Sequence, residues 1–480
     1  MRTAVLLVVL VSTSVLMNCG GSNSSITTTT PLQNPVPTIA AISPNSSELG
    51  SPDITLSVVG SSFIASSTVE WNGTDLVTTF VNDTLLTAVI PTNSLSSAGS
   101  NVVTVFNPQP GGGKSAALSF AVPCPIPTVG GASAQTKARL GAYYFDGWSG
   151  PLTNFHFQGL PFGPYQDREP FSGWQDNTPC AVEQQLALAH NVGVDFFVFD
   201  WYYNVQVNDP GENLNSALQI THSLADRHGM QYAILYVDSS PFDVSPTDWM
   251  SAVNEWVGYM ADPSYLRING LPALFIINVG EMRQIFGTST AVTAALAELR
   301  ATAQSQGLPG VYVVGGFGVP DGTLGKPSLT DGFDIAQQDG YDAVAFYGYP
   351  FAPSPAPGPL PFSQLSAAGQ WTWDQAAQYS ALPFIPTAMS GWDPRPWNET
   401  ESTTGDLMWY TRTPQDFSAF VGSAITWTAS NPQLRPEPTP MPPLVLIEAW
   451  NEFGEGSHFL PTAADNTTYG DALAAMLQAP

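Results

Sequence analysis

Two carboxylates stand three residues apart near the end of the chain, directly after an apolar run. Residues 443–450 read Pro-Leu-Val-Leu-Ile-Glu-Ala-Trp, and Asn451, Glu452, Phe453, Gly454 and Glu455 follow. The apolar run is typical of a buried strand, and packing gives no reason for the acids after it. Paired carboxylates at a strand end are typical of general acid–base catalysis. The alternative is a strand that turns into solvent with both acids hydrated.

The frame that would position these acids is a series of β-type runs that alternate with helical stretches. Eight such runs occur, with helical patterns between them, and the alternation predicts an α/β domain, a (β/α)₈ TIM barrel over residues 140–480. A doubly wound sheet would show the same alternation. The predicted strands are 140–145, 194–201, 231–237, 273–279, 311–315, 343–347, 384–388 and 444–450, and the predicted helices include 181–191, 214–228, 249–260, 290–306 and 414–429.

Polar and aromatic residues follow several of these runs, where a barrel carries its catalytic groups. Tyrosine and tryptophan around carboxylates, with few cations, predict a cleft for neutral polyhydroxylated substrates such as polysaccharides or oligosaccharides. A helix cap is the favoured alternative for Asp146, and packing is an equal alternative for Tyr202, Tyr347 and Trp397. The candidate substrate-binding residues are Asp146, Trp148, Asp200, Trp201, Tyr202, Tyr347, Arg395, Trp397, Asn398 and Asn451.

Composition argues against several other classes of protein. The formal net charge is -26, from 13 Lys+Arg against 39 Asp+Glu, so nucleic-acid binding is not expected. The five histidines show no ligand spacing, and the chain has no nucleophile elbow, zinc motif or dinucleotide loop. We therefore expect neither a metal nor a cofactor.

The N-terminus is typical of an exported protein. Arg2 precedes an apolar run over residues 4–11 that is too short to span a bilayer, which predicts a signal peptide over 1–18. Cys19 follows it and resembles the cleavage site of a bacterial lipoprotein, which predicts a lipid anchor on Cys19 in the membrane of the cell envelope. Ordinary secretion is the alternative. Residues 19–35 are rich in Ser, Thr, Asn and Pro and predict a disordered tether.

Short β-type runs separated by turns predict an all-β sandwich over residues 36–122, followed by a linker over 123–139. The runs are 54–59, 68–71, 76–81, 85–90, 102–106 and 116–122, and residues 111–115 predict a hairpin loop. Pro37-Thr38-Ile39, the turn at Gly60-Ser61-Ser62-Phe63 and Trp71-Asn72-Gly73 resemble an IPT/TIG domain, an immunoglobulin-like module. Cys124 and Cys180 can pair in an oxidising compartment.

Three motifs in the second domain resemble glycoside hydrolase family 99 and its family 71-like and WbsX-type relatives. Residues 449–456, Ala-Trp-Asn-Glu-Phe-Gly-Glu-Gly, are similar to the signature that ends the barrel of that family. Residues 163–170 and 395–398, Arg-Pro-Trp-Asn, are similar to its elements after the first and seventh strands. Phe453 replaces the more usual tryptophan, and Leu460-Pro461 replaces a downstream acid, which leaves the substrate open.

The resemblance implies an endo-acting glycosidase that retains configuration at α-linked glycan, mannan being one option. By position in the motif, Glu452 is the base and Glu455 the general acid/base. Physical chemistry agrees with unequal roles, because one carboxyl of a close pair holds a proton while the other ionises. Two alternatives remain: a WbsX-like glycosyltransferase or polysaccharide-assembly protein, for which no basic pocket for a nucleotide diphosphate is evident, and a non-catalytic glycan-binding protein.

Overall fold

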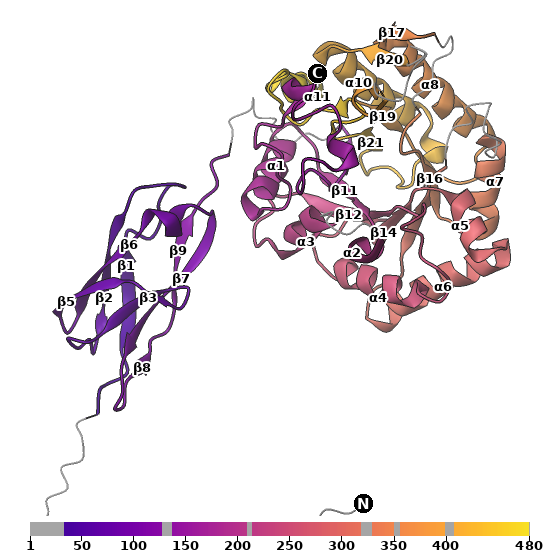
Figure 1. Cartoon of the computed structure of the whole chain (residues 1–480). Helices are drawn as coiled ribbons and strands as arrows, with labels where there is room; N and C mark the ends of the chain where they lie inside the picture. The colour runs from indigo at the N-terminus through magenta and orange to yellow at the C-terminus, as the bar shows by residue number, and fades with distance from the viewer. Residues whose placement is uncertain are drawn as a thin grey trace, which may run out of the picture. The chain divides into compact units, whose positions relative to one another are not determined.

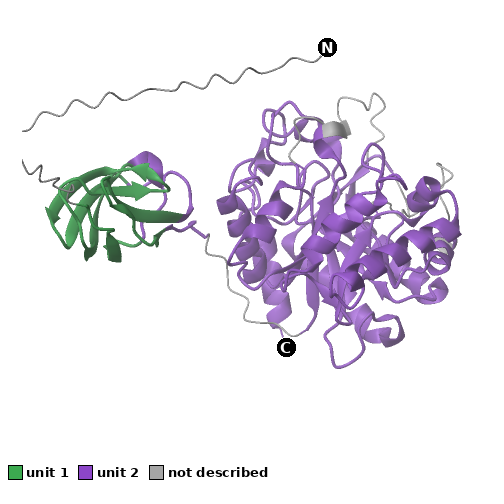
Figure 2. Ribbon diagram, turned by 90° about the horizontal axis from the view of Figure 1, so that it is seen from below, with its two compact units in different colours: residues 1–45, 52–91, 101–120 green, residues 46–51, 92–100, 121–480 purple. Residues whose placement is uncertain are grey.

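The computed structural model describes residues 33–126, 137–208, 214–317, 329–349, 356–398 and 408–479. The predicted signal peptide, Cys19 and most of the predicted tether lie outside these residues. Within them, no helix combines the length and apolarity that a membrane span requires. The chain divides into two compact units, one of residues 1–45, 52–91 and 101–120 and the other of residues 46–51, 92–100 and 121–480 (Figure 2).

The N-terminal strands form a β-sandwich, as the alternating sequence predicts. One sheet has the strand order β1-β2-β6-β5 and is antiparallel, and the other has the order β4-β3-β7-β8 with β9 paired to β7. Leu56, Val58 and Leu86 from the first sheet and Val69 and Val105 from the second are buried in its core. The strands are β1 (Thr38–Ser43), β2 (Ile54–Ser61), β3 (Thr68–Trp71), β4 (Thr74–Asp75), β5 (Val77–Asn82), β6 (Leu85–Ile90), β7 (Gly99–Asn107), β8 (Gly113–Lys114) and β9 (Leu118–Val122).

All six predicted sandwich strands form, and β1, β4 and β8 are additional. The glycine-rich stretch at 111–115 lies in a hairpin, because Phe106 pairs with Lys114 and Asn107 with Gly113 across β7 and β8. This confirms the predicted loop. A short 3₁₀ turn, η1 (Thr92–Leu95), precedes β7.

The second unit is a parallel barrel, and all eight predicted strands form its wall. Each strand pairs in parallel with its neighbours in the order β18-β16-β15-β14-β12-β11-β10-β21-β19. Pro386 alone separates β18 from β19, so these two segments act as one strand that pairs with β16 on one side and β21 on the other and closes the ring. The segments are β10 (Arg139–Tyr144), β11 (Phe196–Trp201), β12 (Gln231–Tyr236), β14 (Leu271–Ile276), β15 (Tyr312–Gly315), β16 (Ala343–Ala345), β18 (Phe384–Ile385), β19 (Thr387–Met389) and β21 (Leu444–Glu448).

Helices surround this ring of strands (Figure 1). The five predicted helices form, although the one predicted over 214–228 ends at Ser223. The helices are α1 (Pro179–Asn191), α2 (Val205–Asn208), α3 (Ser216–Ser223), α4 (Trp249–Met260), α5 (Val279–Phe286), α6 (Ser289–Ser305), α7 (Leu329–Asp339), α8 (Phe362–Tyr379), α9 (Arg395–Asn398), α10 (Pro414–Ser430) and α11 (Thr468–Gln478). Together these observations confirm a (β/α)₈ barrel preceded by an immunoglobulin-like sandwich.

Local sequence explains where several of these helices begin. Thr178-Pro179 and Thr413-Pro414 place a threonine cap before a proline in the first turn, where the missing N–H costs nothing. The Thr413 hydroxyl accepts a hydrogen bond from the Asp416 N–H at 3.1 Å. Thr288 caps α6 and Asn278 caps α5 in the same way.

Shorter elements complete the barrel unit. β22 (Asn451–Glu452) and β23 (Ser457–His458) form an antiparallel hairpin after β21, which we name the carboxylate hairpin, residues 451–458. β13 (Arg267–Ile268) pairs with β14, and β17 (Gly358–Pro361) pairs with β20 (Met408–Thr411). The 3₁₀ turns are η2 (Phe155–Phe157), η3 (Gln166–Arg168) and η4 (Pro432–Leu434).

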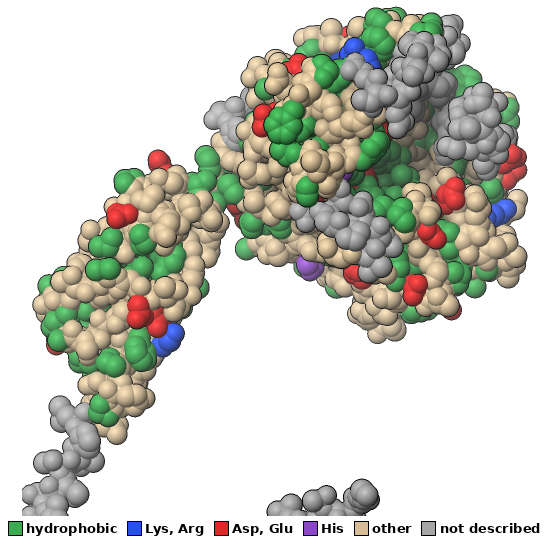
Figure 3. Space-filling view, viewed as in Figure 1, with side chains coloured by type: hydrophobic (Ala, Val, Ile, Leu, Met, Phe, Trp, Pro, Cys, Tyr) green, Lys and Arg blue, Asp and Glu red, His purple; other side chains and the backbone are tan. Residues whose placement is uncertain are grey.

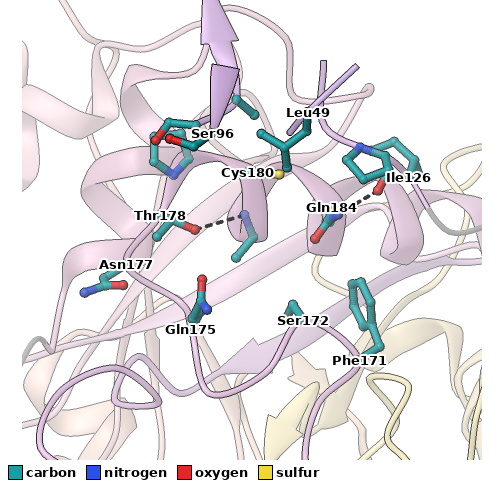
Figure 4. Close-up of a pocket in the computed structure, with 15 residues that line it drawn as sticks. Leu49, Ser96, Ile126, Phe171, Ser172, Gln175, Asn177, Thr178, Cys180 and Gln184 are labelled. Carbon is teal, nitrogen blue, oxygen red and sulfur yellow. Dashed lines mark hydrogen bonds between the residues drawn. The ribbon is translucent and has the colours of Figure 1, made fainter. Parts of the chain in front are cut away.

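Cys124 and Cys180 form a disulfide, with their Cα atoms 5.4 Å apart. Cys180 lies in the first turn of α1, beside Thr178, whose side chain caps that helix. Gln184, one turn further along, donates a hydrogen bond to the Pro125 carbonyl at 2.6 Å. Figure 4 shows Thr178, Cys180 and Gln184 in the lining of a surface cavity beside α1. The disulfide and this bond both hold the segment that precedes β10 against α1.

Candidate active site

Four carboxylates meet at the carboxyl ends of the barrel strands, and we name them the carboxylate cluster. Asp200 comes from the end of β11, Glu448 from the end of β21, and Glu452 and Glu455 from the carboxylate hairpin. Asp200, Glu448 and Glu452 are 2%, 1% and 5% exposed. Burial raises the pKa of Glu448 most, and the charges of Glu455, Glu452 and Asp200 raise it further.

Strand alternation explains why Asp200 reaches this cluster and its neighbour does not. Successive side chains of a strand point to opposite faces, so Asp200 faces the barrel interior and Trp201 faces the helices. The Trp201 indole donates a hydrogen bond to Glu255 on α4 at 3.0 Å and packs against Trp256. Trp201 thus packs against α4, and its predicted contact with substrate stays a prediction.

Tyr347 joins two members of the cluster. Its hydroxyl lies 2.8 Å from Glu452 Oε1 and 3.1 Å from Asp200 Oδ2. A phenol has one proton, so it can donate only one of these bonds, and the other contact needs a proton on a carboxyl group. Asp200 is the better holder of that proton, because burial and then the Glu452 charge raise its pKa well above the ordinary value. Tyr347 can then donate to an ionised Glu452.

The pKa values of both acids of the hairpin are raised, but the two side chains have different surroundings. Burial raises the pKa of Glu452 to about 7, and the hydrogen bond from Tyr347 opposes that rise. Burial and then the charge of Glu452 raise the pKa of Glu455 well above its ordinary value. Glu455 is therefore the acid that keeps its proton more readily, while the hydrogen bond from Tyr347 favours the ionised form of Glu452. This is the arrangement that a general acid beside a general base requires.

Glu448 is a member of the cluster that sequence reasoning missed. Its Oε2 accepts a hydrogen bond from the Ser457 hydroxyl at 2.6 Å, which ties the end of β21 to the carboxylate hairpin. The signal was present in the sequence, because Glu448 is the one charged residue in the apolar run 444–450. One oxygen each of Asp200, Glu448 and Glu452 is buried with no hydrogen-bond partner among the described residues.

Asn451 anchors the first residue of the carboxylate hairpin to a neighbouring segment. Its Oδ1 accepts a hydrogen bond from the Phe145 N–H at 2.9 Å, and its Nδ2 donates one to the Phe145 carbonyl at 2.8 Å. Both polar atoms of the side chain are thus engaged with the main chain that follows β10. Asn451 thus braces the hairpin against the segment after β10, and its predicted contact with substrate stays a prediction.

Tyr202 and Trp397 lie near the acids. Tyr202 packs against Phe145 and Phe242, and burial and then the charges of Asp200 and Glu452 raise the pKa of its phenol. The Trp397 indole donates a hydrogen bond to the His156 carbonyl at 3.0 Å. It also lies against Gly454, between the two acids in sequence, where an added Cβ would meet the ring at 2.0 Å.

Other predicted site residues serve the framework. The buried Asp146 carboxylate accepts a hydrogen bond from the Ala217 N–H at 2.6 Å and so caps α3, as the alternative interpretation held. Trp148 is buried against Phe453 and Trp174. Arg395 pairs with Asp393 at 2.7 Å and stacks on Trp409. The side chain of Asn398 and the whole of Cys19 are outside the described residues.

No three or more histidine, cysteine, aspartate or glutamate side chains in the described part of the chain are arranged to hold a metal ion. The visible surface carries acidic side chains in several places and few lysines or arginines (Figure 3), in keeping with the formal net charge of -26.

Comparison with known proteins identifies the first domain. Residues 37–122 match the IPT/TIG domain family, which confirms the resemblance seen in the turns of the sandwich. A search among curated proteins finds no match to the chain.

Solved structures similar to this chain include glycosidases. One is described as a glycoside hydrolase-like protein, 14% identical, with a TM-score of 0.47 over 75% of this chain and 97% of that chain. Two structures of the GH99 endo-α-mannosidase from Bacteroides thetaiotaomicron are 15% and 16% identical, each with a TM-score of 0.46 over 72% of this chain and 97% and 96% of theirs. These values are too low to assign a function to this chain.

Proposed function

We propose that the barrel is a glycoside hydrolase that cleaves α-linked glycan, with mannan as the first candidate, and retains configuration at the anomeric carbon. The observation that carries this proposal is the pair Glu452 and Glu455, which share one hairpin at the carboxyl ends of the strands, with the Tyr347 hydroxyl 2.8 Å from Glu452. The unpartnered oxygens of Asp200 and Glu448 offer further acceptors for sugar hydroxyls.

In the proposed mechanism the two acids act on opposite sides of the glycosidic bond. Ionised Glu452 takes the proton of the sugar 2-hydroxyl, and that oxygen attacks the anomeric carbon to form an anhydro-sugar. At the same time Glu455 gives its proton to the departing glycosidic oxygen, so the bond breaks without a free alkoxide. Glu455, now ionised, then takes a proton from the water that opens the anhydro ring, and Glu452 returns its proton to the 2-oxygen.

The test is a product assay of the purified protein on α-mannans, α-glucans and bacterial polysaccharides. Wild-type protein should release oligosaccharides, and Glu452→Gln and Glu455→Gln should each lower kcat by about 100-fold or more. Glu298→Gln, at an exposed position on α6, is the matched control and should keep full activity. Sugar binding without turnover by any of these proteins would instead indicate a glycan-binding protein, and transfer from an activated sugar donor would indicate a transferase.

We also propose that the mature protein is exported and anchored to the cell envelope through a lipid on Cys19. The apolar run before Cys19 and the tether after it support this proposal. Labelling of expressing cells with a fatty-acid analogue should mark wild-type protein and leave Cys19→Ser unlabelled. Equal labelling of the two proteins would exclude Cys19 as the anchor.

A further inference from the structure

The carboxylate hairpin has few contacts of its own that could fix the two acids relative to each other. Its two strands share only the pairs Asn451 with His458 and Glu452 with Ser457. Glu452 and Glu455 repel each other whenever both ionise, which favours an open turn. The residues that hold the turn in place must therefore come from other segments of the chain.

Arg168 contacts the first half of the turn. It lies in η3, after β10, and its side chain is 12% exposed. Its Nη1 donates to the Phe453 carbonyl at 2.8 Å and to the Asp393 carbonyl at 3.2 Å, and its Nη2 pairs with the Asp393 carboxylate. The Asp393 N–H in turn donates to the Glu455 carbonyl. One guanidinium thus joins segments that follow β10, β19 and β21.

Arg412 contacts the end of the hairpin. Its Nη1 donates to the His458 carbonyl and, at 3.2 Å, to the Ser390 carbonyl, and its Nη2 donates to Asp465 at 2.8 Å. The segments are packed tightly here, because a Cβ added to Gly456 would lie 2.7 Å from the Asp393 Cβ. Arg168 and Arg412 therefore bracket the turn that carries Glu455.

The same arginines line a cavity of about 400 Å³, which raises the question of an anion site. Arg168, Arg395 and Arg412 are three of only 13 Lys+Arg in the chain. However, Asp167, Asp393 and Asp465 line the same cavity and balance their charge. The hydrogen bonds of Arg168 and Arg412 go to carbonyls, to aspartates and to His458 of the protein itself. The contacts favour a structural clamp over a ligand site.

We propose that Arg168 and Arg412 are positioning residues that clamp the carboxylate hairpin and so set the separation of Glu452 and Glu455. The inference rests on the proposed function for its catalytic consequence, but the clamp itself is a property of the fold. A fixed separation keeps the repulsion between the two acids constant, which holds one protonated while the other ionises. Displacement of such a group by about 1 Å can lower a rate by about 100-fold.

Arg227 offers a matched control. It is buried to a similar degree, with a side chain 13% exposed, and it donates to the Thr221 and His222 carbonyls and to Asp262. It precedes β12 and so belongs to the opposite end of the strands from the acids. Arg227→Gln removes the same kinds of bonds as Arg168→Gln without touching the hairpin.

The first readout is hydrogen exchange of the full-length protein, followed by mass spectrometry of peptides that cover residues 449–458. Arg168→Gln and Arg412→Gln should each speed exchange in these peptides by about 10-fold or more, whereas Arg227→Gln should not. Equal exchange in all four proteins would overturn the clamp, whether or not the protein hydrolyses glycan.

The second readout is the pH dependence of kcat on whichever glycan the wild-type protein cleaves. Arg168→Gln should lower kcat by about 10- to 100-fold and change KM by less than about threefold. It should also shift the pH values at which kcat falls on the acid and alkaline sides of its optimum. Arg168→Lys should recover only part of the loss, because an ammonium cannot reproduce the planar fork that reaches the two carbonyls through Nη1 and the Asp393 carboxylate through Nη2. An unchanged pH profile, with kcat lowered only as far as in Arg227→Gln, would reduce Arg168 to a purely structural role.

Discussion

The Tyr347 hydroxyl lies 2.8 Å from the Glu452 carboxylate, and its hydrogen bond partly offsets the effect of burial, which raises the pKa of Glu452 to about 7. Tyr347 follows β16, the sixth strand of the barrel, and Glu452 follows β21, the eighth. The barrel thus brings together two residues that lie 105 positions apart in the sequence. The ionisation of Glu452 thus depends on a residue from a distant strand.

Tyr347→Phe should raise the pKa of Glu452 further, because the ionised form loses its donor. The catalytic base must be ionised, so the acid limb of the pH profile of kcat should move upward by about one pH unit. Tyr349→Phe is the control, since the Tyr349 hydroxyl bonds the Thr387 carbonyl and none of the four acids. The same displacement in both variants, or in neither, would contradict the role given to Tyr347.

Glu452→Gln should make the protein more stable at pH 8 than the wild type. The folded-state pKa of Glu452 is raised, to about 7 from the usual 4.5, so the folded protein binds this proton more tightly than the unfolded chain. The associated stability is full below pH 4.5 and is lost as pH rises through 7. Glutamine removes that loss, and the free energy of unfolding at pH 8 should rise by about 1 to 3 kcal/mol.

Thermal melts of the wild type and Glu452→Gln at pH 4 and pH 8 would check this prediction. The two proteins should melt at similar temperatures at pH 4 and separate at pH 8. A wild type that gains stability over the variant as pH rises would contradict the raised pKa.

Gly454→Ala should damage the site although it adds one methyl group. The new Cβ would lie 2.0 Å from the Trp397 ring, so either the indole or the hairpin must move. We expect kcat to fall by about 10-fold or more. Gly422→Ala on α10 is the matched control, because its Cβ would meet only the flexible Met476 side chain at 3.5 Å. That change should be neutral or stabilise the helix by up to about 1 kcal/mol.

Cys180→Ser should lower stability by releasing the Cys124–Cys180 disulfide. The bond closes a loop with a sequence separation of 56, for which chain entropy predicts a contribution of about 4 kcal/mol. The measurement is a denaturant titration with and without a reducing agent. Reduced wild-type protein should match the variant, and a variant as stable as the oxidised wild type would show that the disulfide contributes nothing.

The fold could be predicted from the sequence because its strands are long apolar runs between turn residues. The sixth strand, β16 (Ala343–Ala345), and the split seventh strand were still found, since their apolar residues stand out between helices. By contrast, the sequence does not predict β1 (Thr38–Ser43). Most of its side chains are exposed, and a proline stands on each side of it.

The site could be predicted only in part. The pair Glu452 and Glu455 was visible as a motif, and Tyr347 as a polar strand end. Glu448 was absorbed into its apolar run, and the outward direction of Trp201 follows from alternation only after the strand register is known. The contact between Arg168 and Asp393 joins residues 225 positions apart, and no local pattern carries that information.

Pro386 divides the seventh strand position of the barrel into β18 and β19. Proline has no N–H, so the wall lacks one possible cross-strand bond at this residue, and each segment is left with two or three pairs to a single neighbour. The wall is therefore sparsely paired at this seam, the segment 384–389, and we expect it to open there before it opens between β11 and β12, which share six pairs. Amides of residues 384–389 should exchange with solvent sooner than those of β11 and β12, and the seam should be the last part of the ring to close during folding.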